Sequence, residues 1–297
     1  MEAQSNNEFR FENILYLTDF SESSETALPF ALAMARWCEA KVYALHVIIP
    51  SFDAYPTPSF TAAGVASEEE QAQEKMRRVD SQLAGVAHEA IVERATTVWE
   101  PVKLAIEKNH IDLIVLGTHG RTGVPKFFLG SVSEEIFRRS SVSVLSIGPG
   151  VRGGVHNGAR FDHVLFATDF SLEAATAAPY AISLAQKDGA QLILIHVIRK
   201  PRAANATGSS RSEISVAEVM HKLYEIPEHA GLGAAPGISV EYGEPAERIV
   251  EVARQRSADI IVLGVRGDRL GAATHLERAT AHDIVVHAEC PVLVIRD

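Results

Sequence analysis

The sequence predicts an α/β fold, with two doubly wound domains in tandem that each hold a five-stranded parallel sheet. The first reason is internal repetition, because three segments return about 150 positions later with nearly the same residues. The second is that short apolar runs alternate with helical patterns in both halves. The repeated pairs are FENILYLTDFS at 11–21 and FDHVLFATDFS at 161–171, HVI at 46–48 and 196–198, and DLIVLG at 112–117 and DIIVLG at 259–264.

The first half begins with a short apolar run at 13–17, which is typical of a buried parallel strand. Apolar residues recur with helical spacing over 21–38, and a second strand is predicted at 42–48. Residues 67–89 are predicted to form a charged helix, whose acidic start suits the positive end of a helix dipole. The remaining predicted elements are a strand at 91–99, a helix at 101–109, a strand at 112–116, a helix at 131–139 and a strand at 142–147.

The second half repeats this order and gives the domain boundaries. Its predicted strands are 164–167, 191–198, 238–242, 260–263 and 292–295. The glycine-rich stretch 149–160 separates the halves and is the expected linker. We therefore predict a first domain at 1–148 and a second at 161–297.

Composition excludes several classes of function. The formal net charge of -10 argues against nucleic acid or an anionic membrane as the main partner. The sequence has no apolar run of the roughly 18–20 residues that a membrane span needs, and its first eight residues lack the layout of a signal peptide. Only Cys38 and Cys290 are present, at unmatched positions, which predicts small buried thiols and a cytoplasmic location.

A glycine loop follows the predicted strand 112–116. It reads Gly117-Thr118-His119-Gly120, then nine residues, then Gly130-Ser131 at a predicted helix start. Glycines let backbone N–H groups approach phosphate oxygens, and a helix N-terminus favours an anion. Because parallel sheets bind ligands at the carboxyl ends of their strands, this loop is expected to meet Asp19 and Val47 there.

Simpler explanations exist for parts of this pattern. Asp19 and Ser21 have the residue types that cap a helix, and a Gly-x-x-Gly segment alone is a common loop. The loop is neither a Walker loop nor a Gly-x-Gly-x-x-Gly dinucleotide signature. His46 and His196 are expected to be hydrogen-bonded structural residues. His282, His287 and Cys290 only partly share a helical face, so no metal site is expected from protein side chains.

The loop, together with Thr18-Asp19-Phe20-Ser21 and His46-Val47, resembles the universal stress protein family in both halves. The resemblance implies a Rossmann-like, adenine nucleotide alpha hydrolase-like fold, and ATP or ADP with Mg²⁺ or Mn²⁺ on the phosphates. It also implies dimer-like pairing of the fifth strands, and main-chain contact of adenine at Val47. The implied nucleotide-binding residues are Thr18, Asp19, Val47, Leu116, Gly117, His119, Gly120, Arg121, Gly130, Ser131, Val132 and Ser133.

The second half departs from this pattern where the phosphates would lie. Counting back from the fifth strand places Arg278 and Ala279 where the first half has Gly130 and Ser131. An arginine side chain would fill the space that a phosphate tail needs, so we expect ATP to bind weakly or not at all there. A contact of Arg278 with a phosphate is the alternative. The degenerate second site comprises Asp169, Val197, Gly264, Gly267, Arg278 and Ala279.

The expected function is that of a nucleotide-dependent regulatory module in stress response, binding ATP or ADP in the first domain. No catalytic residues are assigned, because neither paired carboxylates nor an evident general base accompany the loop. The alternatives are a slow ATP-hydrolysing or phosphotransfer enzyme and a nucleotide-free scaffold. Expected partners are protein clients of unknown identity and a second copy of the chain. The fifth strands, 142–147 and 291–296, are expected to pair within one chain as a pseudo-dimer.

Overall fold

The computed structural model describes residues 10–50, 62–118, 129–151, 160–199, 215–227, 232, 234–266 and 275–296, with the backbone alone at 62–65 and 275–278. The chain divides into a first compact unit, Arg10–Ala159, and a second unit that contains Arg160–Asp297. No described helix is long and apolar enough to cross a membrane.

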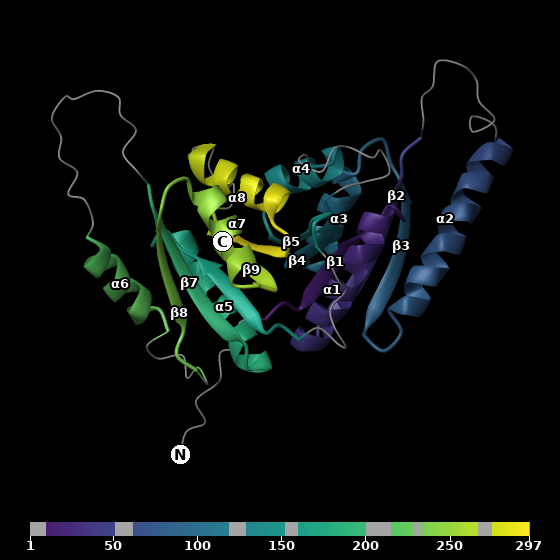
Figure 1. Ribbon diagram of the computed structural model, residues 1–297. Coiled ribbons are helices and arrows are strands. Elements are labelled where there is room, and N and C mark those ends of the chain that lie inside the picture. The colour runs from purple at the N-terminus through teal and green to yellow at the C-terminus, as the bar shows by residue number, and fades with distance from the viewer. Residues whose placement is uncertain are drawn as a thin grey trace. The chain divides into compact units, whose positions relative to one another are not determined.

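Strands and helices alternate through the first unit (Figure 1). The elements are β1 (Asn13–Leu17), α1 (Glu22–Cys38), β2 (Lys41–Ile48), α2 (Ala62–Gln82), β3 (His88–Arg94), α3 (Trp99–Asn109), β4 (Leu113–Gly117), α4 (Ser131–Arg139) and β5 (Ser143–Ile147). All strand pairs are parallel, in the order β3-β2-β1-β4-β5. The order reverses between β1 and β4, which is where doubly wound sheets open a crevice.

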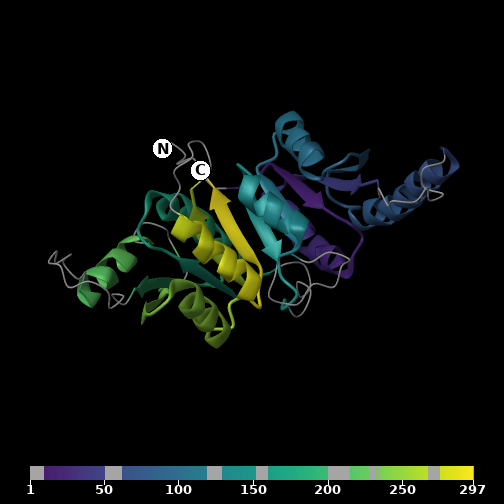
Figure 2. The ribbon, with the colours of Figure 1, turned by 90° about the horizontal axis from the view of Figure 1, so that it is seen from above.

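The second unit has the same architecture. Its elements are β6 (His163–Ala167), α5 (Leu172–Asp188), β7 (Gln191–Ile198), α6 (Val216–Glu225), β8 (Gly237–Tyr242), α7 (Pro245–Gln255), β9 (Ile260–Val265), α8 (His275–His287) and β10 (Val292–Arg296). The strand order β8-β7-β6-β9-β10 matches the first unit position for position. Figure 2 shows α8 lying beside β10, both in yellow. The predicted fold class is therefore confirmed.

Helices cover both faces of the first sheet because alternate strand residues point to opposite sides. Leu15 and Leu17 pack with residues of α3 and α4 in one buried cluster. Tyr16, between them in sequence, points the other way, and its hydroxyl donates to the Ser24 carbonyl of α1 (2.7 Å). The short apolar run of β1 is thus buried on both faces, as expected for a central parallel strand.

The repeated aspartate before β4 and β9 has a structural explanation. The Asp112 carboxylate accepts the Glu12 and Asn13 amides (2.6 and 3.1 Å), and Asp259 accepts the amide of His163 (2.8 Å). Burial raises the pKa of Asp112 above its usual value. These bonds join the starts of two neighbouring strands, at the edge opposite the carboxyl ends.

Two predicted boundaries in the first half are wrong. The helix predicted at 67–89 is α2, Ala62–Gln82, and the strand predicted at 91–99 is β3, His88–Arg94. A turn at Gly85, with φ of +100°, ends the helical segment earlier than the charge pattern indicated. Val98 and Trp99 read as strand residues, but they pack against the core as α3 begins. A local turn thus decides the first boundary, and tertiary packing decides the second.

Candidate functional site

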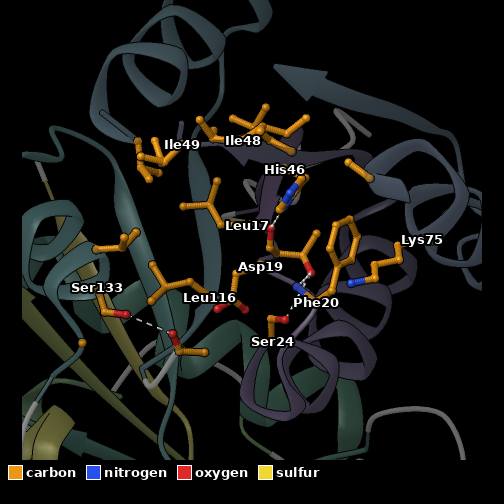
Figure 3. Close-up of a pocket in the computed structure, with 18 of the residues that line it drawn as sticks. Leu17, Asp19, Phe20, Ser24, His46, Ile48, Ile49, Lys75, Leu116 and Ser133 are labelled. Atoms are coloured by element: carbon orange, nitrogen blue, oxygen red, sulfur yellow. Dashed lines mark hydrogen bonds between the residues drawn. The ribbon is translucent and has the colours of Figure 1, made fainter. Parts of the chain in front are cut away.

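A cavity of about 620 Å³ lies at the carboxyl ends of β1, β2 and β4 in the first unit (Figure 3). Residues from the first turn of α4 and one face of α2 complete its wall. Of the residues that the sequence assigned to a nucleotide, nine line it: Thr18, Asp19, Val47, Leu116, Gly117, Gly130, Ser131, Val132 and Ser133. His119, Gly120 and Arg121 lie outside the described residues. Segments far apart in sequence thus converge on one space.

The turn after β1 is held by its own side chains. The Asp19 carboxylate accepts the Ser21 amide (3.0 Å), and the Thr18 hydroxyl accepts the Phe20 amide (3.0 Å). Ser21 caps α1 by accepting the Ser24 amide (3.3 Å), so the capping alternative is confirmed for Ser21. Asp19 shapes the turn and also lines the cavity (Figure 3). Corresponding bonds are made by Thr168, Asp169 and Ser171.

A stack of three side chains borders the base of this turn. Phe20 has a φ of +60°, a conformation that bulky residues rarely adopt. Its ring is tilted by 38° to that of His46, with the two centroids 4.2 Å apart, and the Lys75 ammonium lies 5.6 Å from the Phe20 centroid. His46 donates from Nδ1 to the Thr18 carbonyl (2.8 Å), which fixes the ring, as expected of a structural histidine. These contacts hold Phe20 in its strained conformation.

The second unit repeats the stack with Phe170, His196 and Lys222. The Phe170 and His196 ring centroids lie 4.6 Å apart, and the Lys222 ammonium lies 5.3 Å from the Phe170 ring. His196 donates to the Thr168 carbonyl (2.8 Å), and burial lowers the pKa of its imidazole. A feature common to both units belongs to the fold, so the stack alone indicates no particular ligand.

Helix α4 presents its N-terminus to the first cavity. Its cap, Gly130, has extended backbone (φ −62°, ψ 151°) and donates its amide to the Thr118 carbonyl (2.8 Å). The next three amides, of Ser131, Val132 and Ser133, precede the first intrahelical bond and have no acceptor within the helix. The Ser133 hydroxyl donates to the Gly117 carbonyl (3.0 Å) and so ties the helix start to the end of β4. An anion is the ligand that such an end favours.

Gly117 has a packing role that the sequence did not indicate. A Cβ on Gly117 would lie 2.5 Å from the Ser23 carbonyl oxygen, and one on Gly264 would lie 2.0 Å from that of Glu173. Both separations are far below van der Waals contact. Glycine is therefore required at these two positions because α1 and α5 pack closely on the strand ends, whatever the cavities bind.

Four residues of α2 were missed as cavity residues. Glu68, Gln71, Ala72 and Lys75 line the wall, and their spacing of three and four places them on one helix face. The Glu68 carboxylate also accepts Arg94 Nη2 (3.0 Å). The sequence signal was this spacing, which the high charge of the segment obscured.

The second unit has a cavity of about 500 Å³ at the equivalent strand ends. Asp169, Val197 and Gly264 line it, whereas Gly267 and the Arg278 side chain lie outside the described residues. Pairing of Gly117 with Ile147 and of Gly264 with Ile295 aligns the two units. Counting back equally from those strands makes Ala279 the counterpart of Ser131. Ala279 is exposed on α8 and does not line the cavity.

Helix α8 begins a turn earlier than α4. It starts at His275, four residues before Ala279, whereas α4 starts at Ser131 itself. The amides of Ala279, Thr280 and Ala281 are therefore already bonded to carbonyls of the preceding turn. Among the described residues, the donors that face the first cavity therefore have no equivalents facing the second. The backbone of α8 accounts for this difference, whereas the effect expected of the Arg278 side chain lies outside the described residues.

The residues near the end of α8 do not converge. His287 donates from Nδ1 to the Asp283 carbonyl (2.7 Å), and burial raises the pKa of the Cys290 thiol to about 12. Among the described residues, no three His, Cys, Asp or Glu side chains are arranged to hold a metal ion.

Comparisons with a family model, with known sequences and with solved structures all point to the same family. The model of the universal stress protein family matches residues 10–147 and again 160–296. A universal stress protein of Mycolicibacterium smegmatis is 25% identical over 299 residues, covering 95% of this chain and 96% of that protein. One from Methanocaldococcus jannaschii is 31% identical over 154 residues, which is 46% of this chain and 94% of that protein. The crystal structure of a universal stress protein from Archaeoglobus fulgidus shares the fold, with a TM-score of 0.71, 24% identity and coverage of 97% and 99% of the two chains.

Proposed function

Because this chain belongs to the universal stress protein family, we propose that its first unit binds ATP or ADP and acts as a nucleotide-dependent regulatory module in stress response. One observation carries the proposal. A cavity at the switch point of the sheet ends on the bare N-terminus of α4, beside the acceptor side chain of Asp19. Ligands that combine an aromatic base with an anionic tail fit such a site.

The donor set fits a nucleotide at both ends. The amides of Ser131, Val132 and Ser133 and the Ser131 side chain would hold phosphate oxygens. The Asp19 carboxylate would accept a hydrogen bond from a ribose hydroxyl or the adenine amino group, beside apolar Leu17 and Ile48. Mg²⁺ or Mn²⁺ would be held through the phosphates, because the described residues offer no cluster of metal ligands.

The cavity carboxylates support binding over rapid hydrolysis. Asp19 accepts the Ser21 amide and Glu68 pairs with Arg94, so both are engaged in holding the wall. A general base must instead reach the nucleophile of the reaction. We expect ATP turnover well below about 1 s⁻¹, the lower end of ordinary catalysis. Turnover above that rate in purified protein would favour the enzyme alternative.

A charge placed at the start of α4 tests the proposal. Val132 lines the cavity at the second helical position and is 39% exposed. Val132→Glu suits the helix dipole, so the fold is retained, but it repels phosphates. We expect ATP affinity by calorimetry to fall at least about tenfold, or roughly 1.4 kcal/mol.

The matched control adds the same charge to another helix start. Leu172 begins α5, is 81% exposed and does not line either cavity. Leu172→Glu should leave ATP affinity at the wild-type value. Equal affinity in Val132→Glu and wild-type protein would contradict the proposed site.

A further inference from the structure

The second cavity keeps the strand-end half of the first. Thr168, Asp169 and Val197 line it at the ends of β6 and β7, as Thr18, Asp19 and Val47 do in the first unit. The turn is held alike, since Asp169 accepts the Ser171 amide at 2.9 Å and Asp19 accepts the Ser21 amide at 3.0 Å. Groups that would recognise a base and a ribose are therefore present twice.

In the opposite half of the second cavity, the described residues of α8 offer no unbonded amide to an anionic tail. Thr280 and Ala281 of α8 line it, with amides that are bonded within the helix. Ala281 replaces Ser133, so its methyl group stands where the first unit has a hydroxyl. Arg199, at the end of β7, reaches across and donates from Nη2 to the Thr280 hydroxyl (3.2 Å).

The second cavity is lined by charged groups of both signs. The carboxylates of Asp169 and Glu173 line it together with the guanidinium of Arg199. Glu173 replaces Ser23, its side chain is 12% exposed, and it pairs with Arg266 (2.8 Å). Bonds from its own amide and from Arg266 lower the pKa of Glu173, so it is ionised at neutral pH. The first cavity likewise has two carboxylates and one cation, Asp19, Glu68 and Lys75, so the exclusion of phosphate rests on the backbone of α8 and not on these charges.

We infer that the second cavity binds an uncharged purine nucleoside, a base and ribose without phosphates. The inference rests on the proposed function, because it assigns to Asp169 and Val197 the roles proposed for Asp19 and Val47. The walls suit such a ligand, since Ile195, Leu263 and Ile284 supply apolar surface around the single acceptor turn. The chain thus senses two states of one metabolite class, phosphorylated in one unit and free in the other.

Calorimetry of the full chain with adenosine and with ATP tests the inference. We expect two adenosine sites and one ATP site. Asp169→Asn keeps the oxygen that accepts the Ser171 amide and replaces the other oxygen by a donor, so one adenosine site should weaken at least tenfold. Asp19→Asn is the matched variant, and it should weaken ATP and the other adenosine site.

Isoleucine methyl NMR gives a second test that needs no variant. Ile48 and Ile49 line the first cavity, and Ile249 and Ile284 line the second. Adenosine should shift the methyl resonances of both isoleucine pairs, whereas ATP should shift only those of Ile48 and Ile49. The inference is overturned if adenosine leaves the methyl resonances of Ile249 and Ile284 unchanged. It is also overturned if ATP shifts these two resonances. ATP that shifts neither pair contradicts the proposed function instead, which separates the two failures.

Discussion

Gly117 and Gly264 show that a glycine can be interpreted as a ligand contact when only one unit is considered, although helix packing requires it in both units. In a phosphate loop, a glycine is expected to let the ligand approach the backbone. The structure shows another partner, the first turn of α1 beside Gly117 and of α5 beside Gly264, which leaves no room for a Cβ at either position. Because a helix approaches both glycines equally closely, packing is the role that the two positions share.

Gly264→Ala should destabilise the second unit. The added Cβ would meet the Glu173 backbone at 2.0 Å, so α5 must shift, at a typical cost of about 1–3 kcal/mol. Gly237→Ala is the control, because its Cβ would meet Ile193 at an ordinary 3.6 Å. The measurement is urea unfolding by far-UV circular dichroism. Equal urea midpoints for the two variants would show that α5 can shift without a loss in the free energy of unfolding.

Helices α4 and α8 differ in where they begin, and this decides the chemistry of their cavities. They end at equivalent positions, Arg139 and His287, but α8 is four residues longer at its start, about 6 Å of helix. The start of α1 was predicted well because a cap residue, Ser21, precedes it. The start of α8 was missed, although Thr274 precedes it in the sequence and Glu277 follows Thr274 by three residues, which is a capping-box pattern.

Proline distinguishes the two helix starts. Ser131→Pro puts proline at the first position of α4, where it is tolerated, after a residue that is already extended. Ala279→Pro puts it inside α8, where the ring clashes with the preceding turn at a cost of up to about 3 kcal/mol. We expect urea unfolding to show that loss for Ala279→Pro, and a change within about 0.5 kcal/mol for Ser131→Pro. Similar stability of both variants would mean that α8 begins where α4 does.

The two units can be followed separately because of their tryptophans. The chain has only two, Trp37 in α1 and Trp99 in α3, so both lie in the first unit. Tryptophan fluorescence therefore reports the first unit, and circular dichroism reports both.

Pairing of the fifth strands within one chain stays a prediction, as does association of two chains.

ATP should stabilise one unit only. At a free concentration of about 100 times Kd, binding adds about 2.7 kcal/mol to the unit that binds it. We expect the fluorescence-detected melting of the first unit to rise by several degrees, with no change in a second transition seen by circular dichroism. A shift of the second transition alone would mean that ATP binds the second unit, which would contradict the proposal that it binds the first.

The sequence by itself determined the tandem fold, the order of elements and the segments that meet at the strand ends. Repetition, apolar patterning and glycine spacing can each be recognised in the order of the residues alone, without any knowledge of which residues are in contact. Only the tertiary structure decided that Gly117 lies against Ser23 and that Arg199 reaches Thr280. Those outcomes depend on contacts between residues tens of positions apart, and such contacts exist only once the sheet has brought its strand ends together.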